Sequence, residues 1–180
     1  MAKRLIFLLG GARSGKSHYA ESWAREHGKR VLFVATAQAT DADMRARIAD
    51  HRAARPPDWQ TLEAPIDTAR QIAAAAIEHD TLILDCVTLM SSNILLSLPD
   101  SVSRLEATEA ALRETDRLLD AHSRSSATWL VVSNEVGMGV VPPTRLGVLY
   151  RDMLGRANQR MAQAADELLL LVAGVPWRLK

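Results

Sequence analysis

The chain has 180 residues, of which 48% are hydrophobic and 4% aromatic, a length and composition that suit one domain with its own core. Its 22 basic and 21 acidic residues give a net charge of +1, which argues against a nucleic-acid partner because such proteins usually carry a marked basic excess. The single cysteine, Cys86, excludes an internal disulfide and a cysteine-based zinc cluster, and indicates a reducing cytoplasm.

The first apolar run covers 5–9 and follows the basic pair Lys3 and Arg4. A basic start before an apolar stretch is also the pattern of a signal peptide, but this run is too short for a signal-peptide core or a membrane span. It is typical of a strand buried on both faces of a parallel sheet. We therefore expect a cytoplasmic protein without membrane insertion.

Helix and strand patterns alternate along the rest of the chain. A helix pattern over 16–27 ends at Gly28, a residue common just after a helix. The other helix patterns cover 41–54, 66–79, 89–98, 102–123 and 146–166. Pro56 and Pro57 stop the first of these. The other strand runs cover 31–35, 81–84, 128–133 and 168–173, with a short extended piece at 59–62 and a possible edge hairpin at 175–179.

The stretch between the first strand and the first helix matches a phosphate-binding loop, or P-loop. Its residues are Gly10, Gly11, Ala12, Arg13, Ser14, Gly15, Lys16 and Ser17. Glycines let backbone N–H groups curl around phosphates, and the helix N-terminus adds partial positive charge. Lys16 would reach the β- and γ-phosphates and Ser17 would bind Mg²⁺. The alternative is a glycine-rich turn that binds nothing, but a strand before and a helix after favour the P-loop.

These patterns predict one nucleotide-binding catalytic domain over 1–180. Alternating strands and helices indicate an α/β fold, here a RecA-like P-loop NTPase with a mainly parallel sheet flanked by helices and a possible C-terminal edge hairpin. Ligands of such sheets lie beyond the carboxyl ends of the strands. Gly10, Thr36, Asp85 and Asn134 each follow an apolar strand run directly, so we expect them to contribute to one composite site.

Asp85 is the candidate for a second metal contact. An acid at the end of a central strand can hold Mg²⁺ directly or through water, although it could also cap the next helix. His51 lies beside Arg52 and Arg55 and could attack a phosphorus atom, or could be an ordinary exposed histidine. Thr36 and Glu63 are equally well explained as caps or surface residues.

Several stretches together resemble one known family, the bifunctional adenosylcobinamide kinase / adenosylcobinamide-phosphate guanylyltransferases of cobalamin biosynthesis. The P-loop, Asp85-Cys86-Val87-Thr88 and the C-terminal third all match, and the resemblance spans essentially the whole chain. Its most specific parts are the stretch from His51 to Pro56 and the stretch Asn134-Glu135-Val136-Gly137-Met138-Gly139.

The resemblance implies two reactions. ATP or GTP first phosphorylates the aminopropanol hydroxyl of adenosylcobinamide, and GTP then donates GMP to that phosphate with release of pyrophosphate. It also implies that His51 carries the GMP covalently, that Mg²⁺ assists, and that the protein forms a homo-oligomer, a trimer in the family. The residues implied around the nucleotide, beyond the P-loop, are Ala35, Thr36, Ala37, Arg52, Ala53, Ala54, Arg55, Glu63 and Asp85.

Two other functions are compatible with a P-loop. The first is a plain small-molecule kinase in which His51 only contacts phosphate, and covalent labelling by GMP separates it from the bifunctional enzyme. The second is a RecA-like regulator that gains activity with a protein or DNA partner. The near-neutral charge argues against this regulator, and DNA-stimulated turnover would reveal it.

Overall fold

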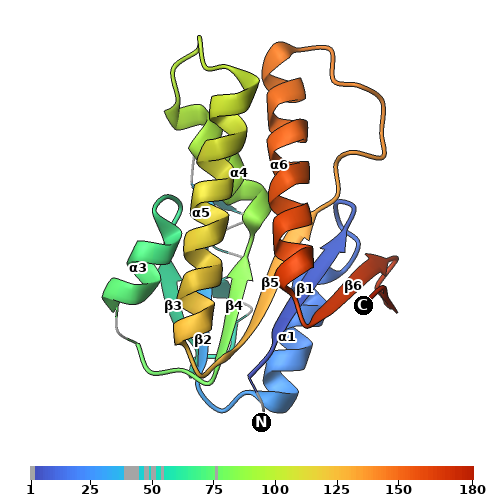
Figure 1. The fold of residues 1–180 in the computed structure, drawn as a ribbon. Helices are drawn as coiled ribbons and strands as arrows, with labels where there is room; N and C mark the ends of the chain where they lie inside the picture. The colour runs from blue at the N-terminus through green and yellow to red at the C-terminus, as the bar shows by residue number, and fades with distance from the viewer. Residues whose placement is uncertain (1–2, 39–44, 47–48, 50–51, 54, 76) are drawn as a thin grey trace.

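A computed structural model describes residues 3–38, 45–46, 49, 52–53, 55–75 and 77–180. Within these residues, one sheet of seven strands has helices on both faces (Figure 1). The strands are β1 (Leu5–Gly10), β2 (Val31–Ala35), β3 (Gln60–Glu63), β4 (Thr81–Asp85), β5 (Thr128–Asn134), β6 (Glu167–Val172) and β7 (Val175–Arg178). The helices are α1 (Lys16–His27), α3 (Thr68–Ala75), α4 (Val87–Ser97), α5 (Arg104–Arg124) and α6 (Arg145–Ala164).

The strand order is β3-β2-β4-β5-β1-β6-β7. All neighbouring pairs are parallel except the last, in which β6 and β7 form an antiparallel hairpin. This confirms the predicted α/β fold with a C-terminal edge hairpin. Strand β5 separates the P-loop strand β1 from β4, which carries Asp85, and this separation is the RecA-like arrangement.

Alternation along each strand divides the core into two layers. Leu5 and Phe7 of β1 face the layer formed with α3, α4, α5 and α6, whereas Ile6 and Leu8 face α1. All four side chains are at most 2% exposed, as expected for strands buried on both faces. None of the described helices combines the length and apolar character that a membrane span requires.

The helices α4, α5 and α6 continue past the carboxyl ends of the strands (Figure 1). There they pack on one another through a third apolar cluster that includes Leu95, Ala111 and Met153. The loop that joins β5 to α6 leaves the sheet at this end and runs beside α6. The sheet edge that should bind ligand is therefore bordered by a helical wall and a long loop.

Two predicted helices need comment. The helix expected over 66–79 is α3, Thr68–Ala75, so both predicted ends were wrong. It starts late because Asp67 has a φ of 48°, outside the helical region. Residues 77–79 are not helical, and Asp80 just beyond them accepts hydrogen bonds from the backbone N–H groups of Lys29 and Arg30, which places the chain beside β2. The helix expected over 41–54 lies largely outside the described residues.

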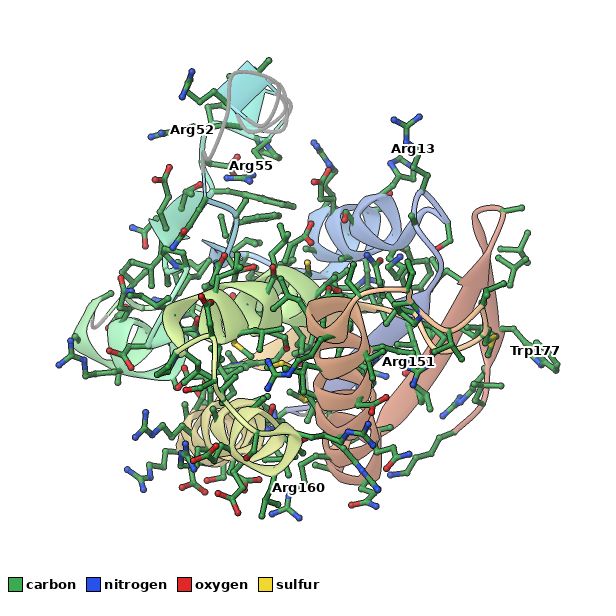
Figure 2. The ribbon with its side chains drawn as sticks, turned by 90° about the horizontal axis from the view of Figure 1, so that it is seen from above. Arg13, Arg52, Arg55, Arg151, Arg160 and Trp177 are labelled. Atoms are coloured by element: carbon green, nitrogen blue, oxygen red, sulfur yellow. The ribbon has the colours of Figure 1, made fainter. Side chains whose placement is uncertain are left out.

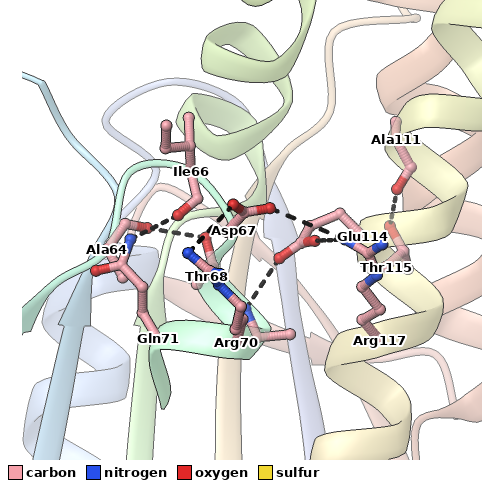
Figure 3. A network of polar contacts seen from close by, with 11 residues as sticks. Ala64, Ile66, Asp67, Thr68, Arg70, Gln71, Ala111, Glu114, Thr115 and Arg117 are labelled. Atoms are coloured by element: carbon pink, nitrogen blue, oxygen red, sulfur yellow. Dashed lines mark hydrogen bonds and ion pairs between the residues drawn. The ribbon is translucent and has the colours of Figure 1, made fainter. Parts of the chain in front are cut away.

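A buried carboxylate joins α3 to α5 (Figure 3). Glu114 is 4% exposed, and its Oε1 accepts a hydrogen bond of 2.9 Å from the backbone N–H of Ala69 in the first turn of α3. Its Oε2 lies 3.5 Å from Nη1 of Arg117. Because the first N–H groups of a helix lack partners inside the helix, Glu114 satisfies a donor that would otherwise be buried without one.

We predict that Glu114→Ala lowers the free energy of unfolding by about 1–3 kcal/mol, the usual cost of leaving a buried donor unsatisfied. Urea unfolding followed by circular dichroism measures the change. The matched control is Glu109→Ala on the same helix, because Glu109 is half exposed and only pairs with Arg113 at 3.7 Å. Its expected cost is below about 0.5 kcal/mol. Equal losses in the two variants would contradict the role given to Glu114.

Candidate nucleotide-binding site

The P-loop has the backbone that phosphate binding requires. Gly15 has a φ of 94° and precedes α1, and a Cβ there would lie 3.0 Å from Cα of Gly174. A Cβ at Gly10 would collide with the carbonyl oxygen of Leu171 on β6. The loop is also fixed from outside, since the N–H of Gly174 donates to the carbonyl oxygen of Ser14 at 2.9 Å. Only glycine fits at positions 10 and 15.

Lys16 turns its ammonium group back into its own loop. Nζ donates to the carbonyl oxygens of Gly10 at 3.0 Å and Gly11 at 2.6 Å, and to Oγ of Ser14 at 3.2 Å. Burial lowers the pKa of Lys16, and the nearby Cys86 and Asp85 oppose that shift. A phosphate that bound in the loop would compensate this desolvated cation, as the P-loop interpretation requires.

Arginines form the opposite wall. The guanidinium of Arg55 lies 3.7 Å from the ring centroid of Phe33, and its Nε is buried without a hydrogen-bond partner among the described residues. Burial lowers the pKa of Arg55, while Asp85 acts in the other direction. Nη1 of Arg52 lies 3.4 Å from Oε1 of Glu63. The guanidinium of Arg55 lines the pocket, where it could pair with an anionic ligand.

These walls enclose a pocket of about 730 Å³, a volume typical of small-molecule sites. Figure 2 looks down on the carboxyl edge of the sheet and places Arg52 and Arg55 on one side and Arg13 on the other. The predicted site residues that line the pocket are Ala12, Arg13, Ser14, Gly15, Lys16, Ser17, Ala35, Ala37, Arg52, Arg55, Glu63 and Asp85. The fold thus brings most of the predicted site together.

Other predicted site residues lie elsewhere or outside the description. Gly10, Gly11, Thr36 and Ala53 are not among the residues that line the pocket. His51 and Ala54 lie outside the described residues. The predicted contact of His51 with the nucleotide therefore stays a prediction.

Thr36 instead joins the ends of two strands. It is fully buried, and its Oγ1 donates to the carbonyl oxygen of Cys86 and accepts from the N–H of Cys86, both at 2.7 Å. The N–H of Thr36 also donates to the carbonyl oxygen of Asp85 at 3.0 Å. Thr36 therefore fixes the position of Asp85 from β2 through backbone contacts.

Sequence reasoning missed several residues of the pocket. His18 and Phe33 lie in regular elements and gave no motif that distinguished them from exposed or core residues. Asn134 is expected in the composite site from its place at the end of a strand, but not among the nucleotide contacts. Lining residues that were not predicted as nucleotide contacts are His18, Phe33, Cys86, Thr88, Leu89, Val132 and Asn134.

The pocket residues suit a magnesium ion that arrives with a triphosphate. Ser17 and Asp85 both line the pocket, and an alcohol and a carboxylate oxygen are ligands that Mg²⁺ accepts alongside phosphate oxygens and water. In the part of the chain that the structure describes, His, Cys, Asp and Glu side chains form no group of three that could hold a metal. The donors present therefore fit an ion bound jointly with phosphate better than one held by the protein alone.

Comparison with known proteins decides among the functions that this pocket allows. The model of the family described as cobinamide kinase / cobinamide phosphate guanyltransferase matches residues 6–179. The chain belongs to this family. It is therefore a bifunctional enzyme of cobalamin biosynthesis, with both a kinase and a guanylyltransferase activity.

Curated relatives match the chain over nearly its full length. The bifunctional adenosylcobalamin biosynthesis protein CobU of Salmonella typhimurium is 39% identical over 181 residues, which cover 98% of this chain and 99% of the relative. The protein of the same name from Escherichia coli is also 39% identical, with the same coverage. The bifunctional adenosylcobalamin biosynthesis protein CobP of Pseudomonas aeruginosa is 42% identical over 173 residues, or 96% and 95% of the two chains.

Cys86 provides a test of the pocket's electrostatics. Burial, with a further contribution from Asp85, raises the pKa of its thiol to about 12. At pH 8 the reactive thiolate should then be on the order of one part in ten thousand. We predict that the native protein reacts with a disulfide reagent at pH 8 at least about a hundredfold more slowly than the protein unfolded in guanidinium chloride.

The control for this experiment is Ser101→Cys, which adds a thiol at an exposed position. That variant should react quickly and with one equivalent while it is folded. Equal rates for Cys86 in the folded and unfolded protein would contradict a buried, protonated thiol.

Proposed function

We propose that this pocket holds the nucleoside triphosphate for both reactions of the family. The observation that carries the proposal is the joint lining of one pocket by the P-loop, by Arg52, Arg55 and Glu63, and by Asp85. The P-loop N–H groups and Lys16 would bind the phosphates. Arg55, whose guanidinium lines the same pocket, would supply a further donor to phosphate oxygen.

In the kinase step, the aminopropanol hydroxyl of adenosylcobinamide attacks the γ-phosphorus of ATP or GTP. The hydroxyl loses its proton, the bond between the γ-phosphorus and its bridging oxygen breaks, and a nucleoside diphosphate leaves. Lys16 lines the pocket, and its charge would stabilise the developing negative charge on phosphate oxygens.

In the guanylyl transfer, a ring nitrogen of His51 attacks the α-phosphorus of GTP. A phosphorus–nitrogen bond forms, the bond between the α-phosphorus and the bridging oxygen breaks, and pyrophosphate leaves. A phosphate oxygen of adenosylcobinamide phosphate then attacks the same phosphorus and frees His51. Two steps avoid the need to align two bulky substrates at once. Two neighbours of His51 in sequence, Arg52 and Arg55, line the pocket, which supports this assignment.

Ser17 and Asp85 are the residues proposed to hold Mg²⁺, which when bound neutralises triphosphate charge. The position of Asp85 depends on Thr36, which fixes the end of β4. A homo-oligomer of three chains, which rests on the resemblance, and a cytoplasmic location, which rests on the lone cysteine, complete the proposal.

The direct test is His51→Ala, assayed separately for the two reactions. We predict that GMP transfer falls by at least about a hundredfold, because the covalent carrier is missing, while the kinase step keeps most of its rate. Equal loss of both activities would argue against a dedicated nucleophile.

Two other histidines sharpen this experiment. His27 lies away from the pocket and stacks on Trp23, so His27→Ala should keep both activities. His18 lines the pocket and is the competing nucleophile. If His18→Ala abolished GMP transfer and His51→Ala did not, the assignment of His51 would be wrong.

A further inference from the structure

The loop between β5 and α6, residues 135–144, leaves the nucleotide pocket at a fixed point. Asn134 lines the pocket, and its N–H donates to Oγ1 of Thr88 at 2.7 Å while its carbonyl oxygen accepts from Asn158 at 3.0 Å. The next N–H, that of Glu135, donates to the carbonyl oxygen of Gly10 at 3.0 Å. The loop therefore starts against the P-loop, at the end of the pocket where phosphates bind.

Farther along, this loop exposes apolar side chains. Met138 is 83% exposed, Val140 95% and Val141 64%. Leu146, in the first turn of α6, is 50% exposed. Single exposed apolar residues are ordinary, but several in one short segment beside an active site indicate a surface that another molecule covers.

The acceptor substrate is the molecule that needs such a surface. A pocket of about 730 Å³ suits one ligand of nucleotide size, so a corrin macrocycle must lie mainly outside it. Its reacting hydroxyl must nevertheless come within roughly 3–3.5 Å of the phosphorus. A corrin ring presents broad apolar faces edged by amide groups. An apolar surface that begins at the phosphate end meets both requirements.

We propose that the 135–144 loop is the docking surface for the corrin ring, with Met138 and Val140 against one of its faces. This inference rests on the proposed function, because it takes the acceptor to be adenosylcobinamide. Another exposed apolar group, on the β6–β7 hairpin, includes Val175 and Trp177. Of the described residues, none from 172 to 180 lines the pocket, whereas Asn134 joins the loop directly to it.

The test uses the double variant Met138→Ser/Val140→Ser, whose high exposure makes a folding defect unexpected. Adenosylcobinamide binding is measured by ultrafiltration from the ligand's own visible absorbance, and KM is measured for each kinase substrate. We expect the Kd and KM for adenosylcobinamide to rise about tenfold, from lost apolar contact. The KM for the nucleotide and the labelling of the enzyme by GTP alone should stay within about twofold.

The matched comparison is Val175→Ser, which removes a side chain that is 66% exposed on the hairpin. It should leave adenosylcobinamide binding unchanged. Three outcomes would each overturn the docking proposal. They are unchanged adenosylcobinamide binding in the loop variant, an equal loss of binding in Val175→Ser, and a loop variant whose oligomeric state shifts while its affinity for the corrinoid stays intact. Failure of the parent enzyme to become labelled by GTP would instead count against the proposed function, so the two failures are distinguishable.

Discussion

The parallel pairing of β1, β2, β4 and β5 is the constraint on which the rest of the structure depends. Parallel strands bring their carboxyl ends to one edge, so the P-loop, Ala35, Asp85 and Asn134 meet there although they are far apart in sequence. Thr36 fixes the ends of β2 and β4 relative to each other, because its hydroxyl both donates to and accepts from the backbone of Cys86. Asp85, the candidate metal ligand, is thus positioned through backbone contacts, and its carboxylate lines the pocket.

The pocket is lined by the cationic side chains of Lys16 and Arg55, which a bound anion would pair with. Lys16 donates hydrogen bonds to uncharged carbonyl oxygens of its own loop, and the guanidinium of Arg55 is held over Phe33. Both groups are partly desolvated, which lowers the pKa of each. A triphosphate would supply negative charge opposite both groups. The same groups could then stabilise charge that develops at the γ-phosphorus in one reaction and at departing pyrophosphate in the other.

Most of the fold and much of the site followed from local sequence patterns. Apolar runs in the sequence predicted the buried strands. Gly15-Lys16-Ser17 between a strand and a helix predicted the P-loop. What the sequence did not predict depends on tertiary packing. The side chain of Thr36 turns toward Cys86 instead of the pocket, Phe33 supports Arg55, and α3 begins at Thr68 because Asp67 leaves the helical region. None of these contacts has a signature in neighbouring residues.

The central claim is that this pocket binds GTP and that His51 carries its guanylyl group. The most direct measurement is the intact mass of the purified protein after incubation with GTP and Mg²⁺. The account predicts one guanylyl adduct per chain, labile in acid, stable in alkali and absent from His51→Ala. Protein that demonstrably binds GTP but forms no adduct would contradict the account and leave a plain kinase in its place.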